Sequence, residues 1–180
     1  DFRVGKEYYW IAAEDSLYGV LDAKGNQLIA YQYNTLIDVQ HKKDLFWVAS
    51  KGALYGVLDQ QGNEVIAHEY DFVSPNFHHG SSHHVVLQML SEYGNVYGDV
   101  FSRAREDFWL LVKDDKQGAA DLEGNILFEP NHYSIAPYPI DDSFGNRTIY
   151  WTLTDTFNNY GLLNSAGHVL IHPHYAKVQV

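Results

Sequence analysis

All four tryptophans of this 180-residue chain occupy the same position of a four-fold internal repeat. Each follows an aromatic residue, and a glycine comes nine or ten residues later. An Asp or Asn stands three residues after that glycine, and a second glycine follows after three more. Self-similarity in a fixed register decides architecture before any local propensity does. The positions, in that order, are Trp10, Gly19, Asp22 and Gly25; Trp47, Gly56, Asp59 and Gly62; Trp109, Gly118, Asp121 and Gly124; and Trp151, Gly161, Asn164 and Gly167.

The Asp-x-x-Gly segments predict tight turns between strands. In the second repeat, the apolar segments 54–58 and 64–66 flank residues 59–62. An Asp that opens a type I turn accepts a hydrogen bond from the backbone, and a Gly at the fourth position can take the positive φ that returns the chain. Each repeat should therefore contain an antiparallel hairpin, preceded by the strand that carries the Trp. Calcium binding is disfavoured, because the turns lack the alternating oxygen ligands and closing Glu of a calcium loop.

These signals predict an all-β fold, an array of four short antiparallel meander or hairpin repeats arranged as a propeller-like ring or a curved solenoid. Repeats this short cannot bury their apolar faces alone, so each must stack on its neighbours. Helical periodicity is not sustained, and the best helical candidate is the short segment 86–92. A single domain over residues 1–180 is predicted, with an insertion at about 74–107. The repeats are expected at about 8–39, 45–73, 108–135 and 149–180.

Burial is the expected role of the repeated aromatic rings. The four tryptophans should lie in equivalent, mostly buried settings, and so should the tyrosine that closes each repeat. The first glycine of each repeat lies inside a strand, where it is costly unless a bulge or a close backbone approach requires it. We expect a Trp or Tyr of one repeat to pack over a neighbour's backbone there. The closing tyrosines are Tyr33, Tyr70, Tyr133 and Tyr175.

Residues 17–29 (Leu-Tyr-Gly-Val-Leu-Asp-Ala-Lys-Gly-Asn-Gln-Leu-Ile) and their three relatives resemble the WG-containing (KWG) repeats of bacteria. That family's pattern is Trp-Gly, two apolar residues, Asp, two residues, Gly, an apolar pair, often Pro, and then Tyr. The likeness covers most of the chain apart from the insertion. It implies a bacterial, all-β, non-catalytic repeat protein. The chain departs from the pattern before the first glycine, where the usual Trp is replaced by Tyr18, Tyr55, Gln117 and Tyr160.

The charge balance argues against some classes of partner. Asp and Glu total 23 against 12 Lys and Arg, a net charge of −11. Phosphate binding needs a basic stripe, so nucleic acid is not an expected partner. No apolar run approaches the roughly 18 residues of a membrane span. The chain has no cysteine, which excludes disulfides, thiolate metal sites and cysteine nucleophiles. The composition suits either the cytoplasm or the periplasm.

The strongest site candidate outside the repeats is the histidine-rich segment 77–84. Histidines four or five residues apart can bind zinc or nickel when a loop folds them together. The segment has no carboxylate to orient the rings, which favours a solvated polar loop. No metal or cofactor is therefore predicted, and the weak metal candidates are His78, His79, His83 and His84. Three histidines of the last repeat are expected at the surface: His168, His172 and His174.

Catalytic motifs are missing from the sequence. It contains no Gly-x-Ser-x-Gly, phosphate-binding loop, His-Glu-x-x-His or dinucleotide fingerprint. The acidic pairs 114–115 and 141–142 fall in expected loops, and nothing sets either opposite a second carboxylate. We therefore expect a protein that is not an enzyme and has no catalytic residues.

The predicted function is that of a non-catalytic bacterial protein-binding repeat protein. A repeat array presents one extended surface, and the segments 74–107 and 135–147 vary between regular units. An acidic chain could cover a basic active site, with its charge speeding the encounter. This favours an inhibitor, such as an immunity protein that masks a basic toxin or effector. The alternatives are a generic envelope or adaptor interaction module, and an enzyme or metal-dependent sensor that uses the histidine-rich loop.

Overall fold

The computed structural model describes residues 2–4, 7–76, 107–132 and 134–178. These residues form sixteen strands and no helix, and they contain no helical segment that could cross a membrane. The all-β prediction is confirmed. The chain divides into two compact units, residues 1–89 and 90–180. The prediction of a single domain stays a prediction.

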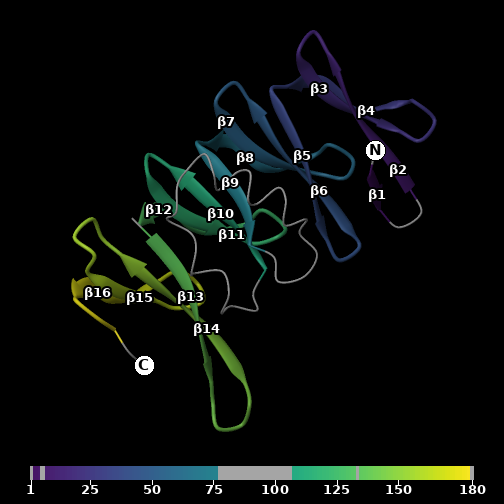
Figure 1. The fold of residues 1–180 in the computed structure, drawn as a ribbon. Helices are drawn as coiled ribbons and strands as arrows, with labels where there is room; N and C mark the ends of the chain where they lie inside the picture. The colour runs from purple at the N-terminus through teal and green to yellow at the C-terminus, as the bar shows by residue number, and fades with distance from the viewer. Residues whose placement is uncertain (1, 5–6, 77–106, 133, 179–180) are drawn as a thin grey trace. The chain divides into compact units, whose positions relative to one another are not determined.

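The first unit contains two four-stranded antiparallel sheets (Figure 1, purple to teal). One has the order β1-β2-β3-β4 and is called repeat 1, and the other has the order β5-β6-β7-β8 and is called repeat 2. Neighbouring strands follow one another in sequence, so each sheet is a meander. The strands are β1 (Phe2–Val4), β2 (Glu7–Glu14), β3 (Leu17–Asp22), β4 (Gln27–Tyr33), β5 (Thr35–His41), β6 (Asp44–Lys51), β7 (Leu54–Asp59), β8 (Glu64–Tyr70) and β9 (Phe72–Asn76).

The second unit repeats the arrangement (Figure 1, green to yellow). Repeat 3 contains adjacent strands in the order β12-β11-β10, and repeat 4 has the order β13-β14-β15-β16. The predicted meander repeats are therefore present in both units, and a ring and a solenoid are both compatible with them. The strands are β10 (Phe108–Lys113), β11 (Lys116–Ala120), β12 (Ile126–His132), β13 (Ser134–Asp141), β14 (Arg147–Thr154), β15 (Tyr160–Leu163) and β16 (Val169–Tyr175).

The four predicted turns share one hydrogen-bonding scheme. In repeat 2, Asp59 Oδ1 accepts hydrogen bonds from the backbone N–H of Gln61 and of Asn63, at 2.9 and 2.8 Å. The Asn63 side-chain amide donates to Asp59 Oδ2 at 2.8 Å. Gly62 takes a φ of +87°, as the turn requires. Asp22, Asp121 and Asn164 accept equivalent bonds in the other repeats. The side chain thus closes each turn and fixes the register of the strands around it.

The glycine inside each strand lies at an irregularity of the ladder. In repeat 2 the pairing shifts between Tyr55 and Val57, on either side of Gly56. A Cβ on Gly56 would lie 2.6 Å from the carbonyl oxygen of Ile66 on the next strand, which no side chain tolerates. The predicted need for a close backbone approach is confirmed. The contact is made by the repeat's own following strand, however, and not by a ring of a neighbouring repeat.

Repeats 1 and 2 pack through their tryptophan and tyrosine rings. Trp47 of repeat 2 meets Tyr9 of repeat 1 edge to face, with ring centroids 6.4 Å apart and an interplanar angle of 81°. Trp47 is 0% exposed and belongs to a buried cluster that includes Ile29 and Tyr33 of repeat 1. The Gln60 side chain donates a hydrogen bond to the Tyr9 hydroxyl, which ties the turn of repeat 2 to repeat 1.

Repeats 3 and 4 pack in the same way. Trp151 of repeat 4 lies 4.9 Å from the ring of Phe108, which precedes the Trp of repeat 3, at an interplanar angle of 82°. It lies 4.9 Å from Phe128 as well, at 74°. The turn glycine Gly167 lies against Phe128, much as Gly62 of repeat 2 lies against Ile29. In both units, therefore, the Trp of one repeat is covered by aromatic and aliphatic residues of the preceding repeat.

The prediction that all four tryptophans are buried is wrong for Trp10. Trp47, Trp109 and Trp151 are buried, whereas Trp10 is 43% exposed. The physical reason is its place in the array. Within each unit the Trp of the second repeat is covered by the first repeat, and among the described residues of its unit no repeat packs in this way over Trp10.

The tyrosines that close the repeats also differ in exposure, and here the exposed one belongs to the last repeat. Tyr33 and Tyr70 are each 3% exposed, as predicted, whereas Tyr175 of the last repeat is 56% exposed. Tyr33 belongs to the buried cluster that joins repeats 1 and 2, and no repeat follows repeat 4 in the described chain. Tyr133 lies outside the described residues.

Candidate functional site

The histidine-rich candidates fall outside the part of the chain that the structure describes. His78, His79, His83 and His84 lie in residues 77–106, together with most of the predicted insertion and the helical candidate. Within the described residues, no group of three or more His, Cys, Asp or Glu side chains is placed to hold a metal ion. The three histidines of the last repeat are exposed, as predicted: His168, His172 and His174.

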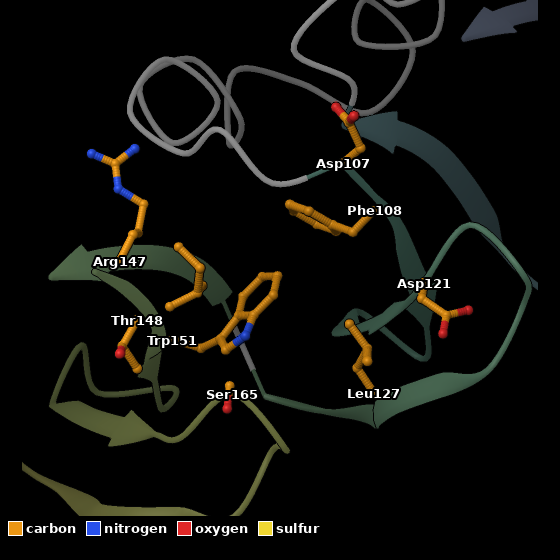
Figure 2. A pocket seen from close by; sticks show the side chains of 9 residues that line it. Asp107, Phe108, Asp121, Leu127, Arg147, Thr148, Trp151 and Ser165 are labelled. Carbon is orange, nitrogen blue, oxygen red and sulfur yellow. The ribbon is translucent and has the colours of Figure 1, made fainter. Parts of the chain in front are cut away.

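A pocket of about 400 Å³ lies in the second unit, where repeats 3 and 4 pack together (Figure 2). Phe108, Leu127 and Trp151 point toward one another and form its apolar wall. Polar side chains surround this wall. The lining residues are Asp107, Phe108, Asp121, Leu127, Arg147, Thr148, Ile149, Trp151 and Ser165.

Two charged groups at the pocket rim are held by structural partners. The Arg147 guanidinium binds the carboxylate of Asp141 through Nε at 2.7 Å and Nη2 at 2.8 Å. The Asp121 carboxylate accepts two hydrogen bonds from Asn125, both at 2.8 Å. The pocket thus offers an aromatic surface with oriented polar groups at its edge. Such a surface suits the binding of an apolar side chain or a small amphipathic group.

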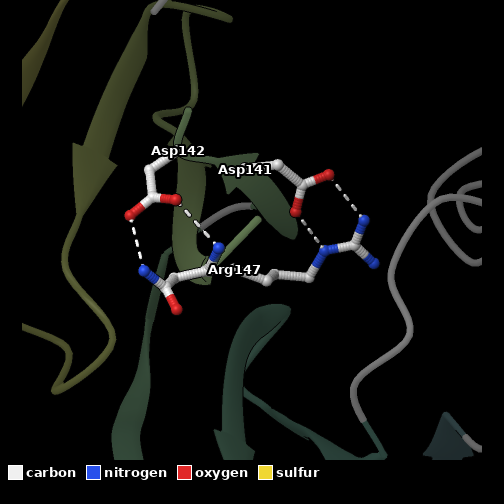
Figure 3. A network of polar contacts seen from close by, with 4 residues as sticks. Asp141, Asp142 and Arg147 are labelled. Atoms are coloured by element: carbon white, nitrogen blue, oxygen red, sulfur yellow. Dashed lines mark hydrogen bonds and ion pairs between the residues drawn. The ribbon is translucent and has the colours of Figure 1, made fainter. Parts of the chain in front are cut away.

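The hairpin between β13 and β14 projects one residue far into solvent. Its turn repeats the Asp-x-x-Gly scheme: Asp142 Oδ1 accepts from the backbone N–H of Phe144 and of Asn146, each at 2.8 Å. Figure 3 shows the Asp142–Asn146 contacts beside the two-bond Asp141–Arg147 pair, which closes the ends of the two strands. Phe144, at the third position of this well-braced turn, is 89% exposed.

A second turn, between β14 and β15, has the same design. Asp155 Oδ1 accepts from the backbone N–H of Phe157 at 2.8 Å and of Asn159 at 2.9 Å. Phe157 again occupies the third position of the turn and is 82% exposed. Asn158 replaces the turn glycine and adopts its positive φ, +59°, which Asn tolerates better than most residues. Repeat 4 therefore presents two phenylalanines on two similar rigid turns.

Hydrogen bonds to these turn carboxylates also favour their charged forms. The side-chain amide of Asn146 is the largest cause of a lowered pKa at Asp142, and the backbone N–H of Asn146 adds to it. Asn159 lowers the pKa of Asp155 in the same way. Both carboxylates are consequently negative at neutral pH, close in sequence to the exposed phenylalanines.

Sequence reasoning missed these two turns, although the signal was present. The segment Asp-Ser-Phe-Gly-Asn at 142–146 matches the Asp-x-x-Gly-Asn turns of repeats 1 to 3 in full, and Asp-Thr-Phe-Asn-Asn at 155–159 differs from them only in the Asn that replaces Gly. They stand at other points of the repeat, and the acidic pair 141–142 by itself predicts only a loop. A search for the turn pattern without regard to its place in the repeat would have found both.

Comparison with known proteins supports the repeat assignment. Residues 55–80 match the family model for the WG containing repeat. No curated protein and no solved structure matches the chain. The matched segment begins at Tyr55-Gly56 and contains the turn of residues 59–62, and the same strand–turn–strand unit recurs in the other three repeats. Residues 55–80 therefore contain a WG-containing repeat.

Proposed function

We propose that this chain is a non-catalytic protein-binding repeat protein that acts as an inhibitor, such as an immunity protein that masks a basic toxin or effector. The repeat family itself suggests a protein-interaction module. The observation that carries the proposal is the pair of exposed phenylalanines, Phe144 and Phe157, on similar braced turns of repeat 4.

Two properties make these phenylalanines suitable as binding anchors. A phenylalanine in water at the tip of a turn gains free energy when a partner's pocket buries it. The turns are already closed by Asp142 and Asp155, so little conformational entropy is lost on binding. Aromatic anchors that a partner desolvates fully often contribute about 2 kcal/mol or more each to binding.

The charge around the anchors favours a basic partner. Asp142 and Asp155 open the two turns, and their lowered pKa values keep them ionised. The whole chain carries a net charge of −11. A field of this sign attracts a cationic surface and raises the rate of encounter at low ionic strength. A toxin with a cationic active site is a partner of this kind, and covering that site would inhibit it.

The proposal is tested by affinity capture from the source organism with two baits. One is the unchanged chain, and the other is the double variant Phe144→Ala/Phe157→Ala, whose side chains lie almost wholly in solvent and can be removed without a cavity. We expect the unchanged chain to retain a basic protein in one-to-one complex and the variant to bind it at least about 30-fold more weakly, which corresponds to about 2 kcal/mol.

A matched control and an activity assay separate the possible roles. Trp10→Arg changes an aromatic residue in repeat 1 and should leave capture of this partner intact. Added salt should weaken the complex, since the attraction is electrostatic. Loss of the partner's activity in the complex supports inhibition, whereas binding without such loss supports an adaptor module instead. Capture of the same protein equally by both baits would overturn the role of the two phenylalanines.

A further inference from the structure

The pocket between repeats 3 and 4 lies where the junction of repeats 1 and 2 is bridged by a side chain. In that first junction, Gln60 is the second residue of the turn of repeat 2, and its side-chain amide donates a hydrogen bond to the hydroxyl of Tyr9 in repeat 1. The corresponding residues of repeats 4 and 3 are Ser165, the second residue of its turn, and Phe108, which precedes a Trp as Tyr9 does. Both of these residues line the pocket.

Two sequence differences between the junctions account for this opening. Ser165 is too short to reach across its junction as Gln60 does, and Phe108 has no hydroxyl to accept a hydrogen bond. A side chain of the protein itself bridges one junction, whereas a pocket of about 400 Å³ is present at the other. Ligand pockets have volumes of about 300–1,000 Å³. The Gln side chain that this junction lacks indicates the shape of an occupant: an unbranched apolar stem that ends in a polar group.

The lining of the pocket indicates the charge of that polar group. The Asp121 carboxylate accepts hydrogen bonds from Asn125, an uncharged residue, so these bonds do not neutralise it. Asp107 contributes a second carboxylate to the lining. Arg147, the basic residue of the lining, is bound to Asp141 by two hydrogen bonds, which offset its charge. A pocket with this balance favours a cation over an anion.

We propose that this pocket binds a long basic side chain, lysine or arginine, presented by a protein partner; that the side chain comes from a partner rests on the proposed function. Lysine and arginine lay an apolar stem along apolar surface while the charged group stays at a polar edge. Leu127 and Ile149 are half-buried pocket residues and offer apolar surface to the stem. Asp107 and Asp121 supply the carboxylates for the charged group.

The pocket adjoins one of the two exposed phenylalanines. Arg147 lines the pocket, and its ion pair with Asp141 closes the strand ends that carry the turn of Phe144 (Figures 2 and 3). Phe157 lies on the turn at the other end of β14. A partner that buries Phe144 can therefore place a neighbouring basic side chain in the pocket, so Phe144 and the pocket should act together.

Refilling the pocket tests the proposal. The double variant Ser165→Gln/Phe108→Tyr restores the two side chains that bridge repeats 1 and 2, an arrangement that the fold already accommodates there. Circular dichroism and thermal melting verify that the variant folds. Binding is then measured by NMR titration of the full chain, with the methyl groups of Leu127 and Ile149 as reporters. The probes are the N-acetyl methylamides of lysine, arginine, norleucine and glutamate.

The probes separate the contribution of charge from that of the apolar stem. Norleucine has an unbranched apolar stem like that of lysine and no charge, and glutamate has the opposite charge. We expect the lysine and arginine probes to bind the unchanged chain at least about tenfold more tightly than the norleucine probe, because a charge-assisted contact is lost with the latter. The glutamate probe should bind most weakly. Refilling the pocket should weaken both basic probes by at least about tenfold.

A second variant tests the carboxylate without filling the pocket. Asp121→Asn removes the charge and keeps an oxygen for the turn, as Asn164 does in repeat 4. It should weaken binding of the lysine and arginine probes and leave the norleucine probe unchanged. Asp22→Asn makes the same change in the turn of repeat 1, outside the pocket lining, and should alter the binding of none of the probes.

Several outcomes would overturn the proposal. A folded chain that binds neither basic probe, or that binds the norleucine or glutamate probe as tightly, would show that the pocket does not select a basic group. Unchanged probe binding after refilling would show that the probes bind elsewhere. Capture of the basic partner equally by the unchanged and the refilled chain, with loss in Phe144→Ala/Phe157→Ala, would overturn this proposal and leave the proposed function standing. Selective binding of the basic probes without any captured partner would instead refute the proposed function and support the preference of the pocket.

Discussion

Trp47 packs edge-on against Tyr9 of the preceding repeat, with ring centroids 6.4 Å apart and an interplanar angle of 81°. The contact gives a structural reason for the aromatic residue that precedes each Trp in the sequence. The aromatic residue before each Trp points to the opposite face of its strand. Within each unit, the Trp of the second repeat packs on the aromatic residue that precedes the Trp of the first: Trp47 on Tyr9, and Trp151 on Phe108.

Replacement of a buried Trp should lower the free energy of unfolding far more than replacement of the exposed Trp10. Trp47→Ala removes a fully buried ring and leaves a cavity, so unfolding free energy should fall by about 3–5 kcal/mol. Trp10→Ala removes a ring already 43% exposed and should cost about 1–2 kcal/mol. Urea denaturation of the two variants measures the difference. Equal losses of stability would contradict the burial of Trp47 against repeat 1.

Two turn glycines, Gly25 and Gly62, allow a second comparison between matched variants. Gly25 and Gly62 have φ values of +84° and +87°, so alanine is strained to the same extent at both, by about 1 kcal/mol. At Gly62 the added Cβ would also lie 2.8 Å from Cγ1 of Ile29, whereas nothing lies within 4 Å at Gly25. Gly62→Ala should therefore cost about 1–3 kcal/mol more than Gly25→Ala.

Thermal melting at one fixed protein concentration compares these two variants. The same comparison in an Ile29→Ala background is informative, because that substitution removes Cγ1 and the extra loss of stability at position 62 should then shrink. Equal melting temperatures for Gly25→Ala and Gly62→Ala would show that Gly62 of repeat 2 is not closely packed against Ile29 of repeat 1.

Fold class could be read from the sequence because the repeat imposes local chemistry that acts over a few residues. Asp59 and Gly62 specify a turn within their own hairpin, and Gly56 specifies a close approach of the adjacent strand. Such contacts depend on spacing alone. The exposure of Trp10 could not be read in this way, because it depends on whether another repeat covers it. A pattern that all four repeats share cannot predict which of the four tryptophans is exposed.

The candidate site was less accessible to sequence reasoning for a similar reason. Phe144 and Phe157 look like ordinary core residues until the turns that carry them are recognised. The pocket depends on how Phe108 and Trp151 of two different repeats meet, which is a property of packing and not of spacing. The ion pair Asp141–Arg147 joins residues six apart across the β13–β14 hairpin. It can be predicted only once the length of that hairpin is known.

Stability of the second unit should fall in mildly acidic solution because of His132. Burial is the main cause of the lowered pKa of this histidine, and the nearby charge of Lys116 adds to it. The folded protein therefore resists protonation of His132 more than the unfolded chain does, whose pKa is near 6.5. This contribution to stability is fully present above pH 6.5 and is lost as pH falls from there toward the folded pKa.

Melting temperatures measured from pH 8 downward test this pH dependence. His132→Gln cannot take up a proton, so it should lose less stability than the unchanged chain over the same window. Lys116→Met keeps the His132 ring and removes the nearby positive charge, so its loss of stability in acid should be intermediate. An unchanged acid response in both variants would show that other groups govern stability in this range.

The turn that presents Phe144 should depend on the acceptor oxygen of residue 142, which either an ionised Asp or an Asn can supply. Asp142→Asn keeps an oxygen for the backbone N–H groups of Phe144 and Asn146, as Asn164 does in the last repeat turn. Asp142→Ala removes it. Hydrogen exchange of these two amides, corrected for intrinsic rates, should be slow in the unchanged chain and in Asp142→Asn, and faster in Asp142→Ala.

The lowered pKa of Asp142 sets the acid limit of these hydrogen bonds: they are fully present above pH 3.8 and are lost as pH falls through the lower folded pKa. Asp142→Asn should therefore keep its protection below that limit, where the unchanged chain loses it, and equal loss in both would disprove the role of the carboxylate.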